Sequence, residues 1–295
     1  MCSPEVMQIV RRQLSGEPRL SRRAMVTASA AAAFTAGMSR SGVMARQAMP
    51  VSSPAAEASP VPGIRPAFAD LSHTMTPDMP VWPGNEPFQA EPVKTFASDG
   101  FYGQKISFWE HTGTHLDAPA HFHEGAETAE HLPVEQFFAP IVVVDIAARA
   151  AEDPDTALTV DDLLAFEAEY GEIPAGAFVA MYSGWAAKID DAEAFVNLDA
   201  DGVQHYPGFH PDAAEFLVSQ RDIVGIGVDT LSQDPGNSTD FGTHITILGA
   251  GKYGVEGLAN LDQVAPAGSS VFIGGPKHLE ASGGPARVIA INRAR

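Results

Sequence analysis

The sequence predicts a single mixed α/β domain that is rich in strands, with helices packed on the sheet. Three observations support this fold class. Hydrophobic residues make up 45% of the 295 residues and charged residues 19%, which is the composition of a globular chain. Short β-branched runs recur along the sequence and outnumber the segments with helical spacing. Gly and Pro number 27 and 23, which implies many turns between short elements.

The first 45 residues are expected to be an export signal rather than part of the fold. The pair Arg22-Arg23 precedes an uncharged, Ala-rich stretch, which is a twin-arginine pattern. That stretch is too short and too weakly apolar to span a bilayer comfortably. An amphipathic helix or a disordered tail is the alternative. We therefore predict an exported protein, periplasmic or extracellular, with a twin-arginine signal at 1–45, a Pro-rich disordered linker at 46–63 and one domain at 64–295.

Ordered structure is expected to begin near Phe68, and six apolar or alternating segments are expected to form strands. The first of them, 104–109, alternates and is expected to bury one face. The others are more continuously apolar, as in strands at the centre of a sheet. These strands are predicted at 104–109, 141–146, 178–182, 223–228, 271–274 and 287–291.

Two segments have the signals of helices. Residues 160–170 follow Thr159, a fitting N-cap, carry acidic residues in the first turn and stop before Gly171. Residues 211–219 begin with Pro211, a residue that the first helical turn tolerates. Helices are therefore predicted at 160–170 and 211–219.

The charge of the chain excludes two classes of partner. The formal net charge is −19, and it is unevenly placed, since residues 1–45 hold six Arg and two Glu. So acidic a remainder would repel nucleic acid and anionic membrane surfaces, so neither is expected as a partner after processing. The single cysteine, Cys2, excludes a disulfide within the chain and a zinc site built from thiolates. Any metal site must therefore use His, Asp and Glu.

One cluster carries the strongest functional signal. His111, His115, Asp117 and His121 fall within eleven residues, together with Gly113. The glycine and a nearby proline make a helix poor here, so we expect a tight loop at the end of a strand, where these side chains converge. Imidazole and carboxylate ligands suit Zn²⁺ or Mn²⁺, and three protein ligands leave a position open for water. A set of unrelated surface histidines is the alternative.

The run from His111 to His121, His-x-Gly-Thr-His-x-Asp-x-Pro-x-His, resembles the signature of the cyclase-like metal hydrolases. That family includes bacterial kynurenine formamidase and isatin hydrolase. Shorter matching stretches lie at 80–84, 227–230 and 256–261, and the likeness runs from Asp70 to the C-terminus. The resemblance implies a swivelling β/β/α fold, a small-molecule substrate and a homodimer or larger homo-oligomer.

The resemblance also implies metal ligands. His111, His115 and Asp117 match the ligands of a first metal, and His244 and Glu256 match the pair that completes a second site in the formamidase branch. Asp117 and Glu256 would bridge the two ions. In the isatin hydrolases an amide stands where Glu256 falls and one Mn²⁺ is used, so the carboxylate here favours two metals. Zn²⁺ is the expected ion, with Mn²⁺ as the alternative.

Two further roles follow from the resemblance. His121 matches the catalytic acid/base, and Trp82 matches an aromatic residue that packs on the substrate, although it could equally be a core residue. The remaining histidines are expected to be ordinary, although His205 and His210 could line the mouth of the pocket. Asp229 is expected to orient a ligand or to cap a strand end.

The expected activity is hydrolysis of a C–N amide bond (N-formyl, aryl or cyclic) or a related ester through a metal-bound hydroxide. The export signal and an extra segment at about 197–211 set the chain apart from compact cytosolic formamidases, so the substrate stays open. Two alternatives remain: a lyase or cyclase on the same metal site, and a non-catalytic protein that binds a small molecule and keeps metal for structure.

Overall fold

The computed structural model describes residues 67–293, so the predicted export signal and linker lie outside the described residues. The chain divides into two units. Residues 94–103 belong to the first unit, and all other described residues belong to the second. Among the residues that the structure describes, no helix is long and apolar enough to cross a bilayer.

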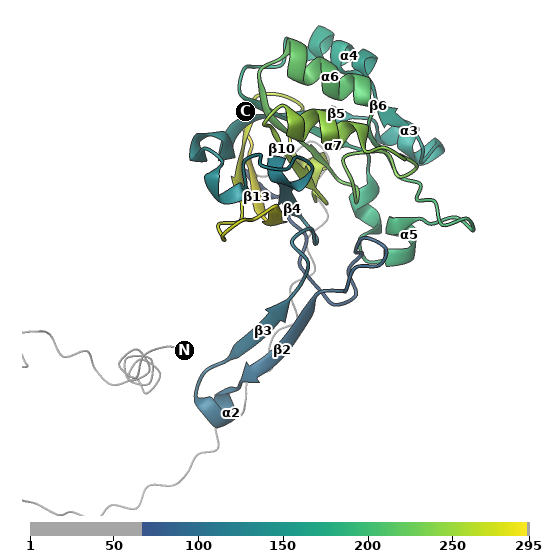
Figure 1. Cartoon of the computed structure of the whole chain (residues 1–295). Coiled ribbons are helices and arrows are strands. Elements are labelled where there is room, and N and C mark those ends of the chain that lie inside the picture. Colours follow the sequence, from purple (N-terminus) through teal and green to yellow (C-terminus); the bar gives the residue numbers. More distant parts are fainter. Residues whose placement is uncertain (1–66, 294–295) are drawn as a thin grey trace, which may run out of the picture. The chain divides into compact units, whose positions relative to one another are not determined.

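A nine-stranded sheet forms the centre of the second unit (Figure 1). Its order is β1-β13-β11-β5-β7-β9-β10-β4-β12, with β5, β7, β9 and β10 parallel and the pairs on either side antiparallel. The strands are β1 (Phe68–Asp70), β4 (His115–Asp117), β5 (Phe138–Asp145), β7 (Ala177–Tyr182), β9 (Ile223–Val228), β10 (Tyr253–Glu256), β11 (Ser269–Gly274), β12 (Gly283–Pro285) and β13 (Arg287–Ile291).

Shorter elements complete the described chain. Two small sheets pair β2 with β3 and β6 with β8. Their strands are β2 (Gln89–Lys94), β3 (Gly103–Ser107), β6 (Ala157–Leu158) and β8 (Gly208–Phe209). The helices are α2 (Phe96–Asp99), α3 (Ala147–Glu152), α4 (Val160–Tyr170), α5 (Ala192–Val196), α6 (Pro211–Gln220) and α7 (Gly242–Gly249). Single 3₁₀ turns are η1 (Pro119–His121), η2 (Ala129–His131), η3 (Val134–Phe137), η4 (Trp185–Lys188) and η5 (Leu261–Gln263).

Residues on the central strands alternate between two hydrophobic cores, because successive side chains of a strand point to opposite faces. On β5, Val142 and Val144 pack in one core with Leu163 of α4 and Leu217 of α6. Ile141 and Val143 of the same strand belong to the other core, among residues of β10, β11 and β13. Figure 1 shows α4 and α6 side by side over the sheet. The predicted mixed α/β fold is confirmed.

Most of the predicted elements are present within one or two residues of their expected bounds. The predicted helix at 160–170 is α4, and Thr159 closes a capping box with Asp162, which satisfies backbone groups at the first turn. The second predicted helix is α6, which extends to Gln220.

Two expectations about local structure were wrong. The strand predicted at 104–109 is β3, and it buries neither face, because it pairs only with β2 and neither strand contributes a buried residue. Alternation in the sequence therefore did not mark burial here. The segment 111–121 is also more than a loop, since His115–Asp117 forms β4 inside the large sheet, hydrogen-bonded on both sides.

Candidate metal centre and cavity

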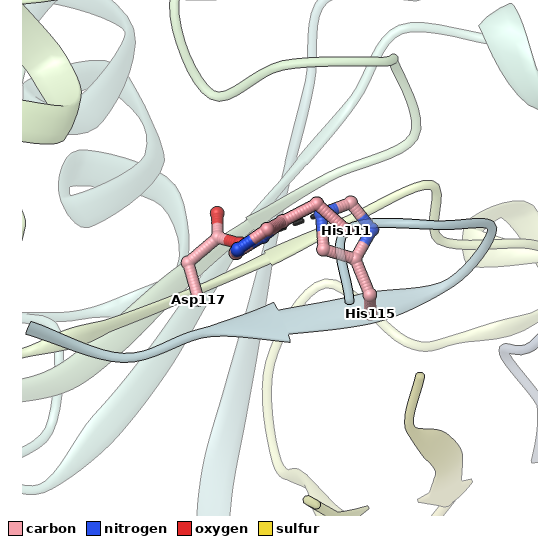
Figure 2. A group of neighbouring side chains, drawn as sticks. All are labelled: His111, His115 and Asp117. Atoms are coloured by element: carbon pink, nitrogen blue, oxygen red, sulfur yellow. Dashed lines mark hydrogen bonds and ion pairs between the residues drawn. The ribbon is translucent and has the colours of Figure 1, made fainter. Parts of the chain in front are cut away.

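The chain reverses at Gly113 and brings His111 back over the strand that follows. Gly113 has a φ of 67°, and a Cβ there would lie 2.7 Å from Cε of Met79, so only glycine fits this turn without strain. His115 and Asp117 then project from β4, and Figure 2 shows their side chains converging with that of His111. Nδ1 of His111 lies 2.7 Å from Oδ1 of Asp117, and Nε2 of His115 lies 3.3 Å from the same oxygen.

A second group of ligand atoms shares Asp117. His244 comes from α7 and Glu256 ends β10, and both are buried. Nε2 of His244 lies 3.1 Å from Oε1 of Glu256 and 3.6 Å from Oδ2 of Asp117. In each group, His111–His115–Asp117 and Asp117–His244–Glu256, the potential ligand atoms lie within 4.8 Å of one another. The fold therefore brings together all five predicted ligand residues.

In His115 and His244, the ring nitrogen that points away from the carboxylate cluster already has a hydrogen-bond partner. Nδ1 of His115 lies 2.8 Å from the Gly113 carbonyl, and Nδ1 of His244 lies 2.5 Å from Oδ2 of Asp234. Each Nδ1–H donates to its oxygen, so in the neutral ring Nε2 holds a lone pair that faces carboxylate oxygens. Nε2 of His115 is buried without a hydrogen-bond partner. Lone pairs that face one another need a proton or a metal cation between them, and histidines that ligate metals are held in this way. The residues present fit a divalent metal ion.

The pKa values of His115 and Asp117 also indicate a cluster that favours a bound cation. Burial opposes a positive charge on His115, but the carboxylates of Asp117 and Glu256 outweigh it and raise the pKa of His115 to about 10. Burial would likewise raise the pKa of Asp117, yet the surrounding histidines hold it well below its ordinary value. This fully buried cluster therefore stabilises positive charge, which a divalent ion would supply.

His121 stands beside the ligands, at the end of η1. Its ring stacks on that of His111, with the centroids 3.8 Å apart and the planes at 22°. Burial lowers the pKa of His121 to about 4. The imidazole is therefore neutral near pH 7 and can accept a proton.

Four of the five predicted ligand residues, His111, His115, His244 and Glu256, line a cavity of about 480 Å³, and His121 and Trp82 line it as well. Trp82 packs against Phe241, with ring centroids 6.1 Å apart. Among the described residues that line the cavity, none is Lys or Arg, and His205 and His210 do not line it. Several aromatic side chains contribute to the wall: Trp82, Trp109, Phe122, Phe195 and Phe241.

Other residues of the centre were not predicted. Gln233 donates from Nε2 to Oδ2 of Asp117 at 2.7 Å and from its backbone N–H to Oε1 of Glu256 at 2.9 Å. Asp234 holds His244, as described above. Asp229 contacts no ligand, but accepts from the backbone amides of Ser183 and Trp185. No local motif marks Gln233 or Asp234, because their partners lie on distant elements.

Comparison with known proteins agrees with the geometry. A family model described as "Putative cyclase" matches residues 69–235. The chain is 37% identical over 210 residues to an isatin hydrolase of Roseibium aggregatum, covering 68% of this chain and 79% of the relative. It is 27% identical over 231 residues to a kynurenine formamidase of Bacillus cereus, covering 75% of this chain and 96% of the relative.

A solved structure has the same fold. Isatin hydrolase A from Labrenzia aggregata, bound to benzyl benzoate, superposes with a TM-score of 0.73 at 34% sequence identity. The match covers 77% of this chain and 94% of that chain. Together with the family model and the relatives, this similarity shows that the chain belongs to the Cyclase family.

Proposed function

We propose that this protein is a metal-dependent hydrolase of amide bonds whose substrate is a neutral, aromatic cyclic amide. The observation that carries the proposal is the cluster of His111, His115 and Asp117, whose potential ligand atoms lie close together and whose two histidines line an aromatic cavity. The relatives named isatin hydrolase and kynurenine formamidase both act on amide bonds, which agrees with this reaction class.

His111, His115 and Asp117 would hold the first ion, and His244 and Glu256 would join Asp117 around a second. We propose Zn²⁺ as the ion, with Mn²⁺ as the alternative, because both accept imidazole and carboxylate ligands. When bound, such an ion activates water near neutral pH and polarises a carbonyl group. Nδ1 of His115 and Nδ1 of His244 keep their rings oriented through their hydrogen bonds to Gly113 and Asp234.

His121 is assigned the proton transfers. Its neutral ring lines the cavity beside His111 and can take a proton from the attacking water. The same ring then returns that proton to the nitrogen that leaves the broken amide.

The cavity favours an uncharged aromatic substrate. Its wall is rich in aromatic side chains, and the described residues that line it include no Lys or Arg. Isatin is a neutral aromatic cyclic amide, whereas N-formylkynurenine carries a charged amino-acid head group, for which the described lining offers no Lys or Arg side chain. Trp82 lines this cavity, and we propose that its ring stacks on a planar substrate.

Turnover after metal removal tests the proposal. The full chain is treated with a chelator, desalted and assayed on isatin, N-formylaniline and a simple lactone, with and without added Zn²⁺ or Mn²⁺. We expect no turnover without metal and ring opening of the cyclic amide with it. The appearance of one carboxylate per bond broken distinguishes hydrolysis from a lyase or cyclase reaction. Metal binding without turnover of any amide or ester would contradict the proposed function.

We also propose that the protein is exported and forms a homodimer or larger homo-oligomer. The twin-arginine pattern at Arg22-Arg23 supports export, and the family resemblance supports self-association. Light scattering of the purified chain measures the assembly, and a monomeric mass at micromolar concentration would contradict it.

A further inference from the structure

A chain of hydrogen bonds leads from the far side of His111 to the protein surface. Nε2 of His111 lies 3.0 Å from Oγ of Ser282. That hydroxyl lies 2.6 Å from Oε2 of Glu110, and the other carboxylate oxygen lies 2.6 Å from Nε2 of His278. The outer end is half-exposed at His278, whereas His111 and Ser282 are partly buried. The motif at 111–121 did not include Ser282, Glu110 or His278.

The number of available protons fixes the direction of these bonds. A serine hydroxyl has one proton to donate, whereas an ionised carboxylate can only accept. The proton of Ser282 therefore goes to Glu110, at the short distance typical of a bond to a charged oxygen. The lone pairs of the same hydroxyl are then left for His111, so Nε2 of His111 must be the donor of the bond between them.

This direction decides which nitrogen of His111 can bind a cation. With its one proton on Nε2, the neutral ring has a bare Nδ1. That atom is the one that faces Oδ1 of Asp117, 2.7 Å away, a separation that needs a proton or a metal cation between the two atoms. If Glu110 did not take the serine proton, the hydroxyl could donate to Nε2 instead. The proton of the ring would then move to Nδ1 and form a hydrogen bond with Asp117, in direct competition with a metal.

The backbone next to Ser282 also holds the ring in place. Ser282 directly precedes β12, which pairs with β4 on the side of Asp117. At Gly283 an added Cβ would lie 2.6 Å from Cε1 of His111, so the ring lies directly against this strand. Ser282 is therefore set at a fixed distance from the imidazole.

We infer that Ser282 and Glu110 are positioning residues of the metal centre, which hold the proton of His111 on Nε2 and so present Nδ1 to the ion. The inference rests on the metal centre of the proposed function. Partners of this kind, behind a ligating histidine, typically contribute 10–100-fold to metal affinity. His278 lies at the outer end and should matter little, because Glu110 accepts the serine proton with or without it.

The test compares Zn²⁺ affinity in four variants of the full chain by competition with a chromophoric chelator. Ser282→Ala and Glu110→Leu remove the acceptor chain, and both should lower affinity about 10–100-fold. Ser282→Thr keeps the hydroxyl and should retain wild-type affinity. Glu130→Gln is the structural control, because Glu130 accepts from the backbone of Glu280 in the same segment but does not contact His111. It should bind Zn²⁺ as the wild type does.

A second readout locates the proton directly. In Zn²⁺-loaded protein with ¹⁵N-labelled histidine, NMR should show the N–H of His111 on Nε2. The inference is overturned if that proton is on Nδ1, if Ser282→Ala stays within twofold of wild-type affinity, or if Glu130→Gln loses as much affinity as Ser282→Ala. Neither readout uses a substrate, so lack of turnover would count against the proposed function alone. A wild-type chain that binds no Zn²⁺ would contradict both.

Discussion

At the scale of single residues, His121 is expected to transfer protons without binding the metal. It stacks on His111 but belongs to neither group of converging ligand atoms. His121→Ala should therefore keep its metal and lose about 10²–10⁴-fold in kcat, the usual contribution of a general acid–base residue. KM should change little, because the lost interaction acts mainly in the transition state.

The measurement for His121→Ala is kcat together with metal content, beside His131→Ala as a control on an exposed histidine. Loss of metal would make His121 a ligand. Full activity would show that another group protonates the leaving nitrogen.

Glu256 is expected to determine whether a second ion can bind. It offers Oε1 to His244 and Oε2 to His115, so it faces both groups. Glu256→Gln removes one negative charge and one strong ligand and should lower the bound metal toward one ion per chain. Metal analysis of desalted protein measures the ratio. A ratio that does not change between wild type and variant would show that the centre holds a single ion.

Gln233 ties the two shared carboxylates together, through its side-chain amide to Asp117 and its backbone amide to Glu256. Gln233→Leu keeps most of the volume but leaves Oδ2 of Asp117 without its donor. We expect metal affinity to fall about 10–100-fold. Gln204→Leu is the matched control, since Gln204 is also a buried glutamine but lies away from the ligands. Equal losses in the two variants would mean that only core packing was disturbed.

At the scale of elements, β12 supports the metal centre from the edge of the sheet. A Cβ on Gly283 would lie 2.3 Å from the Leu116 carbonyl on β4, as well as against His111. Gly283→Ala should therefore push β12 away from β4, cost about 1–3 kcal/mol of stability and weaken metal binding. Thermal unfolding and chelator competition measure the two effects. Gly103→Ala, where the added Cβ meets only ordinary contacts, should change neither, and an unaltered Gly283→Ala would contradict this role.

His205 is expected to stabilise the segment 197–211 to a degree that depends on pH. Its ring lies between Asp155 and Asp199, and hydrogen bonds to these carboxylates raise the pKa of His205 above its ordinary value. Because the folded-state pKa is the higher one, the stabilisation is complete below about pH 6.5 and is lost as pH rises through the raised value. The Tm of His205→Gln should fall below wild type at pH 5.5 and approach it at alkaline pH. A gap that does not depend on pH would exclude this contribution.

The sequence predicted elements well where burial was continuous, and less well where it was not. The segments that form β5, β7 and β9 are apolar on both faces of the strand. Their sequences alone therefore predict strands buried in the core. The alternating run at β3 looked half-buried, yet Ile106 is 53% exposed, because alternation shows which side chains share a face and not what covers that face. The short β4 was missed, since its pairing depends on β10 and β12 far along the chain.

At the scale of the whole molecule, we expect the basic segment 1–45 to direct export and to be removed from the acidic remainder of the chain. Replacing both Arg22 and Arg23 with Lys should trap the precursor in the cytoplasm, because the signal depends on the arginine pair. Fractionation and immunoblotting follow the mature form. Its continued appearance outside the membrane would contradict twin-arginine export.

In the candidate site, too, residues close together in the sequence could be predicted from their spacing, whereas residues that only the fold brings near could not. The spacing of His111, His115 and Asp117 is visible in the sequence, and the fold converts it into converging ligand atoms. His244 and Glu256 came from family resemblance alone, because spacing did not single them out. Gln233 and Ser282 could not be predicted, since their hydrogen bonds join residues that lie far apart in the sequence.

We propose that amide hydrolysis in this protein depends on a metal held by His111, His115 and Asp117. The most direct test is a parallel metal titration of chelator-treated wild type and His115→Ala, with bound Zn²⁺ and turnover of the aromatic cyclic amide measured in the same samples. We expect turnover in the wild type to rise in proportion to the first ion bound. His115→Ala should fail to bind that ion tightly and should remain inactive. Turnover by metal-free wild type, or full activity in His115→Ala, would contradict the account.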